Sequence, residues 1–361
     1  MIAFLLACSG DEPGDSQAAE DTSVVPEVWA LVEIDPDAQP PPLLSELGLT
    51  RWDGSALSYH DEALAYELNT PLFSDFALKE RAVWMPEGRS ATVNSDGTLD
   101  FPVGTVILKS FLFPADFRAP QDDLALIETR VMLRGSAEWT AWPYLWRADG
   151  SDAELHVSGD VQTIDFIDPH GASRTAQYLV PQRNQCVDCH DQYDATGERV
   201  LMPIGPNARA LSSAVLTFLT GTAAAGADVQ VDWTAIESGG VDSLSPAEVE
   251  TAARDYLDIN CAHCHSPKGV EGVTSQFFLN HDNTDAFNLG ICKRPGSAGE
   301  GGVDREFDIV PGDPKASILW YRTATEDIGA MMPDIGRSLT HDTGAELIWR
   351  WIAEMEPDDC Q

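Results

Sequence analysis

The chain has 361 residues, 43% of them hydrophobic, which is enough to bury two or three compact cores. Lysine and arginine number 22 against 59 aspartates and glutamates, so the formal net charge is −37 at pH 7. Such a charge argues against binding to nucleic acid or to anionic lipid headgroups, and it favours basic partners or simply high salt.

The first eight residues are an apolar segment ending in Leu5-Leu6-Ala7-Cys8, which resembles a bacterial lipobox. Cleavage before Cys8 would leave a thiol for a diacylglycerol anchor, and Ser9 after it favours the outer membrane. The segment is too short for a transmembrane helix, and the alternative is an ordinary apolar N-terminus with a stray cysteine. Residues 9–42 are rich in Asp, Glu, Ser, Gln and Pro and predict a flexible tether.

Residues 43–181 predict a β-rich domain. Runs of β-branched and aromatic residues separated by short Gly, Asp and Pro breaks occupy residues 101–113, 124–133 and 139–146. Several short strands in succession favour an antiparallel sandwich or a partly closed barrel. We interpret the Trp and Tyr residues here first as core aromatics and second as the lining of a ligand pocket.

Two C-x-x-C-H motifs follow, Cys186 to His190 in the segment 182–240 and Cys261 to His265 in the segment 241–361. Two thiols three positions apart can add to the vinyl groups of one haem, and the adjoining imidazole then reaches the iron. A zinc site or a thioredoxin-like pair gives no reason for histidine to follow both pairs. The sequence therefore predicts two covalently attached haem c groups, on Cys186, Cys189 and His190 and on Cys261, Cys264 and His265.

The sequence does not decide which residue is the sixth ligand of the first iron. Met202 is favoured because it lies 12 residues after His190 (202 minus 190) and directly before Pro203. The alternatives are His60, His156 or His170 of the β-rich domain, or no ligand. The uncharged stretch Ala210 to Ala227 predicts a packed helix and then a loop, rather than a membrane span.

The second motif has helices on both sides in the sequence. Ser245-Pro246-Ala247-Glu248 is a capping box with proline at the first helical position, and the helix it starts runs into Cys261. A second helix is indicated by an apolar stripe at Ala345, Ile348, Trp351, Ile352 and Met355. Two such helices packed over a macrocycle resemble a class I cytochrome c, so the expected fold is α+β, a β-rich domain followed by all-α cytochrome c-like haem modules.

Met332 is the expected distal ligand of the second haem. It lies 67 residues after His265 (332 minus 265) and directly before Pro333, as the distal methionine of class I cytochromes c commonly does. A thioether ligand favours ferrous iron and suits reversible one-electron transfer. Met331 is the second choice, and both methionines could instead fill gaps in a core.

Several short stretches together resemble a family of poorly characterised bacterial dihaem c-type cytochromes. The resemblance covers nearly the whole chain and implies haem content and electron transfer, but no agreed substrate. The stretches that carry it are Tyr66 to Asp75, Lys79, Arg81, Gly104-Thr105, Lys109, Glu128-Thr129-Arg130, Pro203 to Pro206 and Asn260 to His265.

Three cysteines lie outside the two motifs. In an oxidising compartment Cys292 and Cys360 could form a disulfide that closes a loop of 68 residues (360 minus 292), and two free thiols are the alternative. Cys8 is reserved for the lipid.

The expected function is one-electron transfer outside the cytoplasm, by a protein anchored through lipid at the outer membrane, facing the periplasm or the cell surface, with a periplasmic or membrane redox partner. The alternative is an enzyme of the dihaem peroxidase or oxidase type, with an open first iron and a pocket shaped by the β-rich domain. A third reading makes that domain a binding module for a partner protein.

Overall fold

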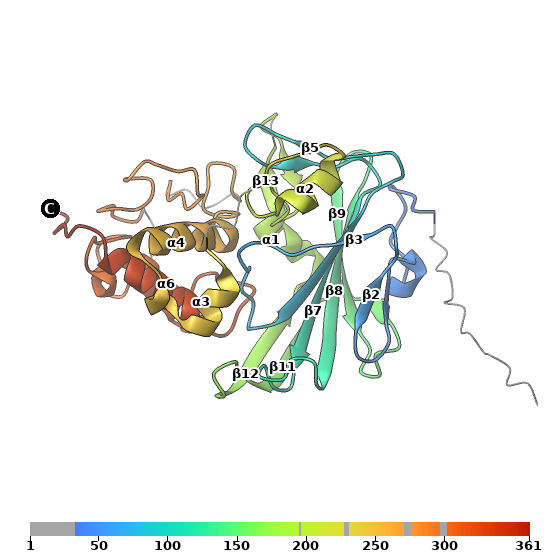
Figure 1. Ribbon diagram of the computed structural model, residues 1–361, viewed down its shortest axis with the longest axis horizontal. Helices are drawn as coiled ribbons and strands as arrows, with labels where there is room; N and C mark the ends of the chain where they lie inside the picture. Colours follow the sequence, from blue (N-terminus) through green and yellow to red (C-terminus); the bar gives the residue numbers. More distant parts are fainter. Residues whose placement is uncertain (1–32, 195, 227–230, 271–275, 297–301) are drawn as a thin grey trace, which may run out of the picture. The chain divides into compact units, whose positions relative to one another are not determined.

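A computed structural model describes residues 33–194, 196–226, 231–270, 276–296 and 302–361, all within one unit that spans Leu31–Gln361. The expected lipobox with Cys8, and residues 9–32 of the expected tether, lie outside the described residues. The described part combines helices with antiparallel sheets, which is the α+β class expected (Figure 1).

The largest sheet has six antiparallel strands in the order β10-β9-β8-β7-β4-β3. It is open, with β10 and β3 at its edges, so it is not a closed barrel; the sequence favoured a sandwich or a partly closed barrel. Its strands are β3 (Leu64–Ala65), β4 (Leu78–Trp84), β7 (Val106–Pro114), β8 (Leu124–Arg134), β9 (Trp139–Trp146) and β10 (Ala153–Leu155).

Both faces of this sheet are buried along the middle of β7. Val106 and Leu108 pack on one face with the segment around Leu44 and Leu49, whereas Ile107 packs on the other face with α2 (Ser213–Thr220). This division follows from the two-residue period of a strand, which sends successive side chains to opposite faces.

Four two-stranded hairpins flank the sheet. Among them, β11–β12 packs its Phe166 and Tyr178 against Phe111 and Phe113 of β7. The hairpins pair β1 (Thr50–Trp52) with β2 (Leu57–Tyr59), β5 (Thr92–Val93) with β6 (Leu99–Asp100), β11 (Asp160–Ile167) with β12 (Ser173–Val180), and β13 (Asp191–Tyr193) with β14 (Arg199–Leu201).

Two of the three strands expected from the sequence are confirmed as β8 and β9. The third, expected over 101–113, begins only at Val106. The reason is a turn in which the N–H of Thr105 donates to the carbonyl of Pro102 and Gly104 has a φ of 92°. A Cβ at Gly104 would lie 2.9 Å from Pro86 Cγ, so this position favours glycine in both conformation and space.

The helices are short except near the second motif. The packed helix and following loop expected within 210–227 are present: α2 ends at Gly221, which adopts a left-handed φ of 66°; residue 227 lies outside the described residues. None of the described helices is long and apolar enough to cross a membrane. The others are α1 (Val187–His190), α3 (Trp233–Gly239), α4 (Pro246–Cys261), α5 (Ile318–Ala324) and α6 (Asp342–Ala353).

Helices α4 and α6 pack against each other in their own hydrophobic core, which includes Leu257 and Ile348. The expected start of α4 is confirmed, because the carboxylate of Glu248 accepts hydrogen bonds from the N–H and the hydroxyl of Ser245. The helices meet closely at Gly344, where a Cβ would lie 2.4 Å from Tyr256 Oη.

The expected disulfide between Cys292 and Cys360 is present, with Cα atoms 4.9 Å apart. It ties the loop after Gly290 to the end of the chain beyond α6. Asp358 lies within 4.8 Å of both sulfur atoms, but sulfur atoms joined in a disulfide are not thiolates and do not bind a metal as thiolates do.

Candidate functional site

The second C-x-x-C-H motif continues directly from α4. Cys261 is the last residue of the helix, and the N–H groups of Cys264 and His265 donate to its carbonyl at 3.1 and 2.8 Å. A Cβ at Gly269 would lie only 2.1 Å from the carbonyl oxygen of Cys264, so the chain after the motif can fold back over it only with glycine here. No pattern in the sequence marks Gly269 as part of the site.

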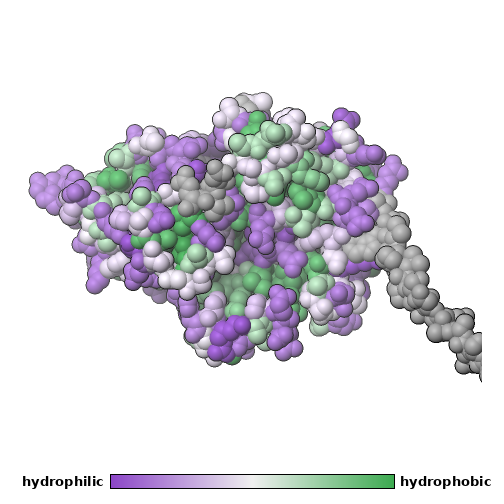
Figure 2. Space-filling model, viewed as in Figure 1, coloured by the Kyte–Doolittle hydropathy of each residue, from purple (hydrophilic) through white to green (hydrophobic). Residues whose placement is uncertain are grey.

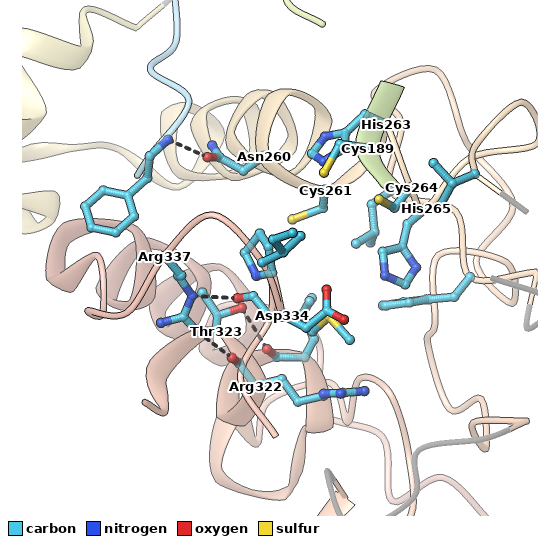
Figure 3. A pocket seen from close by; sticks show the side chains of 18 of the residues that line it. Cys189, Asn260, Cys261, His263, Cys264, His265, Arg322, Thr323, Asp334 and Arg337 are labelled. Atoms are coloured by element: carbon cyan, nitrogen blue, oxygen red, sulfur yellow. Dashed lines mark hydrogen bonds between the residues drawn. The ribbon is translucent and has the colours of Figure 1, made fainter. Parts of the chain in front are cut away.

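A cavity of about 680 Å³ opens beside this motif (Figure 3). Its volume lies in the range of roughly 300–1,000 Å³ that is usual for ligand and cofactor sites. The residues of chemical interest that line it are Cys189, Cys261, Cys264, His265, Arg322, Met332, Asp334 and Arg337. Met331 is buried outside this lining, and so the cavity distinguishes between the two candidate methionines.

Arg337 fixes the backbone around Met332. This arginine is only 7% exposed and donates four hydrogen bonds at 3.0–3.1 Å, all to backbone carbonyls. One acceptor is Met332 itself, whose N–H in turn donates to the carbonyl of Arg322 at 2.8 Å. The other acceptors are the carbonyls of Arg322, Thr325 and Leu339.

Burial keeps the two motif histidines neutral. It lowers the pKa of His265 to about 4, although the backbone of Phe277 favours the charged form. It lowers the pKa of His190 to about 3, with the carbonyl of Met202 acting in the opposite sense and Lys109 and Arg130 adding to the decrease. A neutral imidazole keeps a lone pair on one nitrogen, which a metal ligand requires.

The ring of His190 has a defined tautomer. Its Nδ1 lies 2.7 Å from the carbonyl oxygen of Met202, and because a carbonyl only accepts, Nδ1 carries the proton. The lone pair is therefore on Nε2. The N–H of Met202 donates to the carbonyl of His190 at 2.8 Å, so the two residues face each other across the start of the β13–β14 hairpin.

The other histidines considered for the first iron lie elsewhere. Nδ1 of His60 accepts from the N–H of Glu62, Nε2 of His156 lies 3.2 Å from the carbonyl of Gly159, and His170 is exposed in the β11–β12 turn. None of the three is among the described residues that line the 680 Å³ cavity.

The two motifs meet through their second cysteines. Cys264 Sγ lies 3.8 Å from the carbonyl of Asp188, the residue before Cys189. The neighbouring Cys264 thiol lowers the pKa of Cys189, whereas the Cys189 thiol, together with burial, raises the pKa of Cys264. Figure 3 shows Cys189 beside Cys264 and His263, although 75 residues separate Cys189 from Cys264 (264 minus 189).

Backbone contacts reinforce this junction. The N–H of Tyr193 donates to the carbonyl of Lys268 at 3.1 Å, and the guanidinium of Arg199 donates to the carbonyl of Gly269 at 3.1 Å. The β13–β14 hairpin after the first motif is thus tied to the loop after the second motif.

A segment of the β-rich part docks on the second motif from the other side. Asn260, the residue before Cys261, accepts from the N–H of Phe73 at 2.8 Å and donates to the carbonyl of Pro71 at 3.1 Å. The ring of Phe73 stacks on His341 with centroids 4.3 Å apart. The carboxylate of Asp75, 1% exposed, accepts from the N–H groups of Ser338 and Leu339, in the loop after Met332.

Comparisons with known protein families, with curated proteins and with solved structures found no match to this chain.

Proposed function

We propose that this chain is a dihaem c-type cytochrome that passes single electrons between partner proteins outside the cytoplasm. One observation carries the proposal: the cavity gathers the second motif, the candidate ligand Met332 and the second cysteine of the first motif. Haem bound at such sites supplies a reversible one-electron couple at iron.

At the second motif, Cys261 and Cys264 would hold the porphyrin by thioether bonds, and His265 and Met332 would hold the iron. Burial supports the role of His265, since it lowers the pKa of that side chain to about 4 and so keeps it uncharged. Arg337 acts as a positioning residue, because its four backbone contacts fix the loop that carries Met332.

At the first motif, Cys186 and Cys189 would carry the porphyrin and His190 would bind the iron through Nε2. The hydrogen bond from Nδ1 to Met202 supports this role, because histidine ligands of metals usually donate their other N–H to a carbonyl or carboxylate. We therefore assign Met202 to the proximal side. Its backbone lies behind the imidazole, which disfavours the earlier expectation that its sulfur binds the opposite face of the same iron.

Transfer between the two sites would use the proximity of Cys189 and Cys264, which line the same cavity. Each of these cysteines would hold one haem, so the fold would keep the two haem groups near each other. The protein's part is to hold these groups at a fixed separation, through the hairpin contacts of Tyr193 and Arg199 with Lys268 and Gly269.

The alternative is an enzyme of the peroxidase or oxidase type. The contact of the Met202 carbonyl with His190 Nδ1 favours this alternative, because it leaves the first iron without an assigned sixth ligand. Electron paramagnetic resonance and resonance Raman spectra of the oxidised and reduced protein count the six-coordinate irons. Two six-coordinate irons support the electron carrier, and one five-coordinate iron supports the enzyme.

The proposed location is the outer membrane, through lipid on Cys8, with a basic redox partner in the periplasm or at the surface. The sequence motif and the charge of −37 support it. The native protein should partition into a detergent phase, and Cys8→Ser should release it or block its processing. Unchanged partitioning of Cys8→Ser would exclude the anchor.

Intact mass tests the cofactor directly. Protein matured in a host with a cytochrome c maturation system should carry two covalent haems, and Cys186→Ala or Cys261→Ala should each weaken attachment of one. The matched control is the double variant Cys292→Ser with Cys360→Ser, which removes two cysteines from the disulfide and should retain both haems. A wild-type product with no haem or one haem contradicts the proposal.

A further inference from the structure

Four basic residues gather on one face of the six-stranded sheet, in a chain with only 22 lysines and arginines. Arg81 of β4, Lys109 of β7 and Arg130 of β8 are directly opposite one another in the strand register. Lys79 lies two residues before Arg81 and therefore on the same face. We call these four residues the cationic row.

Three of the four side chains converge on the ring of Phe111. Lys79 Nζ, Lys109 Nζ and Arg130 Cζ lie 5.9, 5.1 and 4.4 Å from the ring centroid of Phe111. Arg81 is 8% exposed, and the Arg130 side chain is 31% exposed. Like charges that face each other across strands repel, and the repulsion is larger when water is partly excluded.

The nearby acidic groups only partly balance this charge. Glu128, fully buried, forms an ion pair with Arg130 and also accepts from the hydroxyl of Tyr178. Asp75 and Glu67 act on Lys79 and Arg81 through space only, and both oxygens of Asp75 accept hydrogen bonds from Ser338.

The side chains of Lys109 and Arg81 form no hydrogen bond or ion pair with any residue that the structure describes. Burial, and then the neighbouring guanidinium of Arg81, lowers the pKa of Lys109 well below its usual value. The cationic row is thus an arrangement that a bound negative charge would stabilise.

The cationic row lies beside the first motif. Arg130 acts electrostatically on Cys186 and Cys189, and both Lys109 and Arg130 act on His190. The attached group would therefore come next to these cations.

We propose that the cationic row is an anion-binding site that holds a carboxylate or a small oxyanion beside the first C-x-x-C-H motif. This inference rests on the proposed haem at Cys186 and Cys189. Two sources share the required chemistry: the propionates of that haem, or a free oxyanion that binds next to it. In both cases the negative charge pairs with Lys109 and Arg81 and relieves the repulsion along the row.

The test uses protein whose mass shows both haems, so a failure of haem attachment rejects the proposed function before the anion site is in question. Spectroelectrochemistry gives the two reduction potentials of wild type, Lys109→Met and Lys109→Arg. Arg147→Met is the matched control, because Arg147 is an exposed cation of the same part of the chain. A measurement on Met332→Ala assigns the two reduction potentials. The potential that this variant shifts belongs to the second haem, and the remaining potential belongs to the first haem.

If the haem propionates are the anion, Lys109→Met lowers only the first potential, since a lost positive charge favours ferric iron. Lys109→Arg restores it, and sulfate added at constant ionic strength has no effect on wild type. If a free oxyanion binds, sulfate shifts the first potential of wild type with saturation and does not shift that of Lys109→Met.

Two results together overturn the proposal. The first is that Lys109→Met and Arg147→Met have the same reduction potential for the first haem. The second is that sulfate has no saturable effect on this potential in wild type. Should Lys109→Met mature poorly, Lys79→Met is the second variant, and the same outcomes decide.

Discussion

At the scale of single residues, Met331 and Met332 are neighbours in sequence but have different surroundings. Met332 lines the cavity, whereas Met331 is 9% exposed and packed elsewhere. We expect Met332→Ala to abolish the weak near-red sulfur-to-iron charge-transfer band of the oxidised protein and to lower the second potential, because the thioether favours ferrous iron. Absorption spectra and potentiometry measure both effects.

Met331→Ala is the matched control for this prediction and should keep the band and the potential. If Met331→Ala abolishes the band and Met332→Ala does not, the ligand is one residue earlier. If neither variant changes the band, a methionine ligand at this module is excluded.

Glu237 joins α3 to the start of α6. Its carboxylate accepts hydrogen bonds from Trp233, His341 and Thr343. Burial alone would raise the pKa of Glu237, but these hydrogen bonds together with the nearby His341 outweigh burial and lower the pKa below 4.5. An acid with a lowered pKa in the folded state stabilises the fold at neutral pH, and this contribution is lost as the pH falls through the folded pKa.

We therefore expect Glu237→Gln to reduce the free energy of unfolding at neutral pH by about 1 kcal/mol, allowing for partial exposure. The difference from wild type should shrink as the pH falls below 4.5. Urea unfolding at a series of pH values measures it, and Glu346→Gln on the exposed side of α6 is the control. A difference that stays constant with pH would show that the lost contribution is not ionic.

Sequence spacing identified both C-x-x-C-H motifs and ranked Met332 above Met331, because the proposed covalent attachment and axial ligation would leave local patterns. It gave no signal for Arg337, whose role depends on carbonyls from four separate positions. It also favoured Met202 from a proline that follows it, while the hydrogen bond to His190 that argues otherwise is visible only in three dimensions.

At the scale of elements, the close approach of α4 and α6 depends on Gly344. A Cβ there would lie 2.4 Å from Tyr256 Oη, so alanine must push the helices apart or move the Tyr256 ring. Overpacking of this kind typically costs about 1–3 kcal/mol. We expect Gly344→Ala to lower the free energy of unfolding of the holoprotein by that amount in urea titrations.

Gly239→Ala provides the matched comparison. Gly239 ends α3, and the nearest atom to its Cβ position is 3.6 Å away, an ordinary contact. Alanine there should leave stability unchanged or slightly increased. Equal losses in the two variants would show that the α4–α6 contact is not the cause.

Local sequence patterns predicted several helices and strands with nearly correct bounds. The capping box at Ser245 places the start of α4, and the β-branched and aromatic runs at 124–133 and 139–146 form β8 and β9. The error lies at a glycine: Gly104 delays the start of β7, because its left-handed backbone interrupts a run whose side chains would otherwise continue the strand.

At the scale of the whole molecule, the charge of −37 is spread over the surface. Figure 2 shows hydrophilic residues distributed over the visible face of the described part. Long-range attraction then depends on ionic strength, because the Debye length falls to about 10 Å at 0.1 M salt.

We expect electron transfer with a basic small redox protein to slow as salt increases, and transfer with an acidic one to quicken. Stopped-flow rates of haem oxidation, measured with one partner of each charge at several salt concentrations, test this. Rates that respond to salt in the same direction for both partners would contradict steering by net charge.

The contacts between the β-rich part and the part that carries the second motif could not be predicted from the sequence. Asn260 binds the backbone of Phe73 across 187 residues, and Asp75 binds the loop near Ser338 across 263 residues. Such contacts depend on the tertiary fold. Neither the period of hydrophobic residues nor the spacing of motifs predicts which distant segments will meet.

The proximity of Cys189 and Cys264 also bears on how the protein is assembled. Before any haem is attached, a folded chain would hold two thiols of different motifs in one cavity and close enough to shift each other's pKa, with that of Cys189 lowered. In an oxidising compartment such a pair can close into a disulfide, which would remove one attachment point from each haem. Haem insertion should therefore precede final folding, and haem-free protein refolded in air should lose two hydrogens by mass when the Cys189–Cys264 pair oxidises.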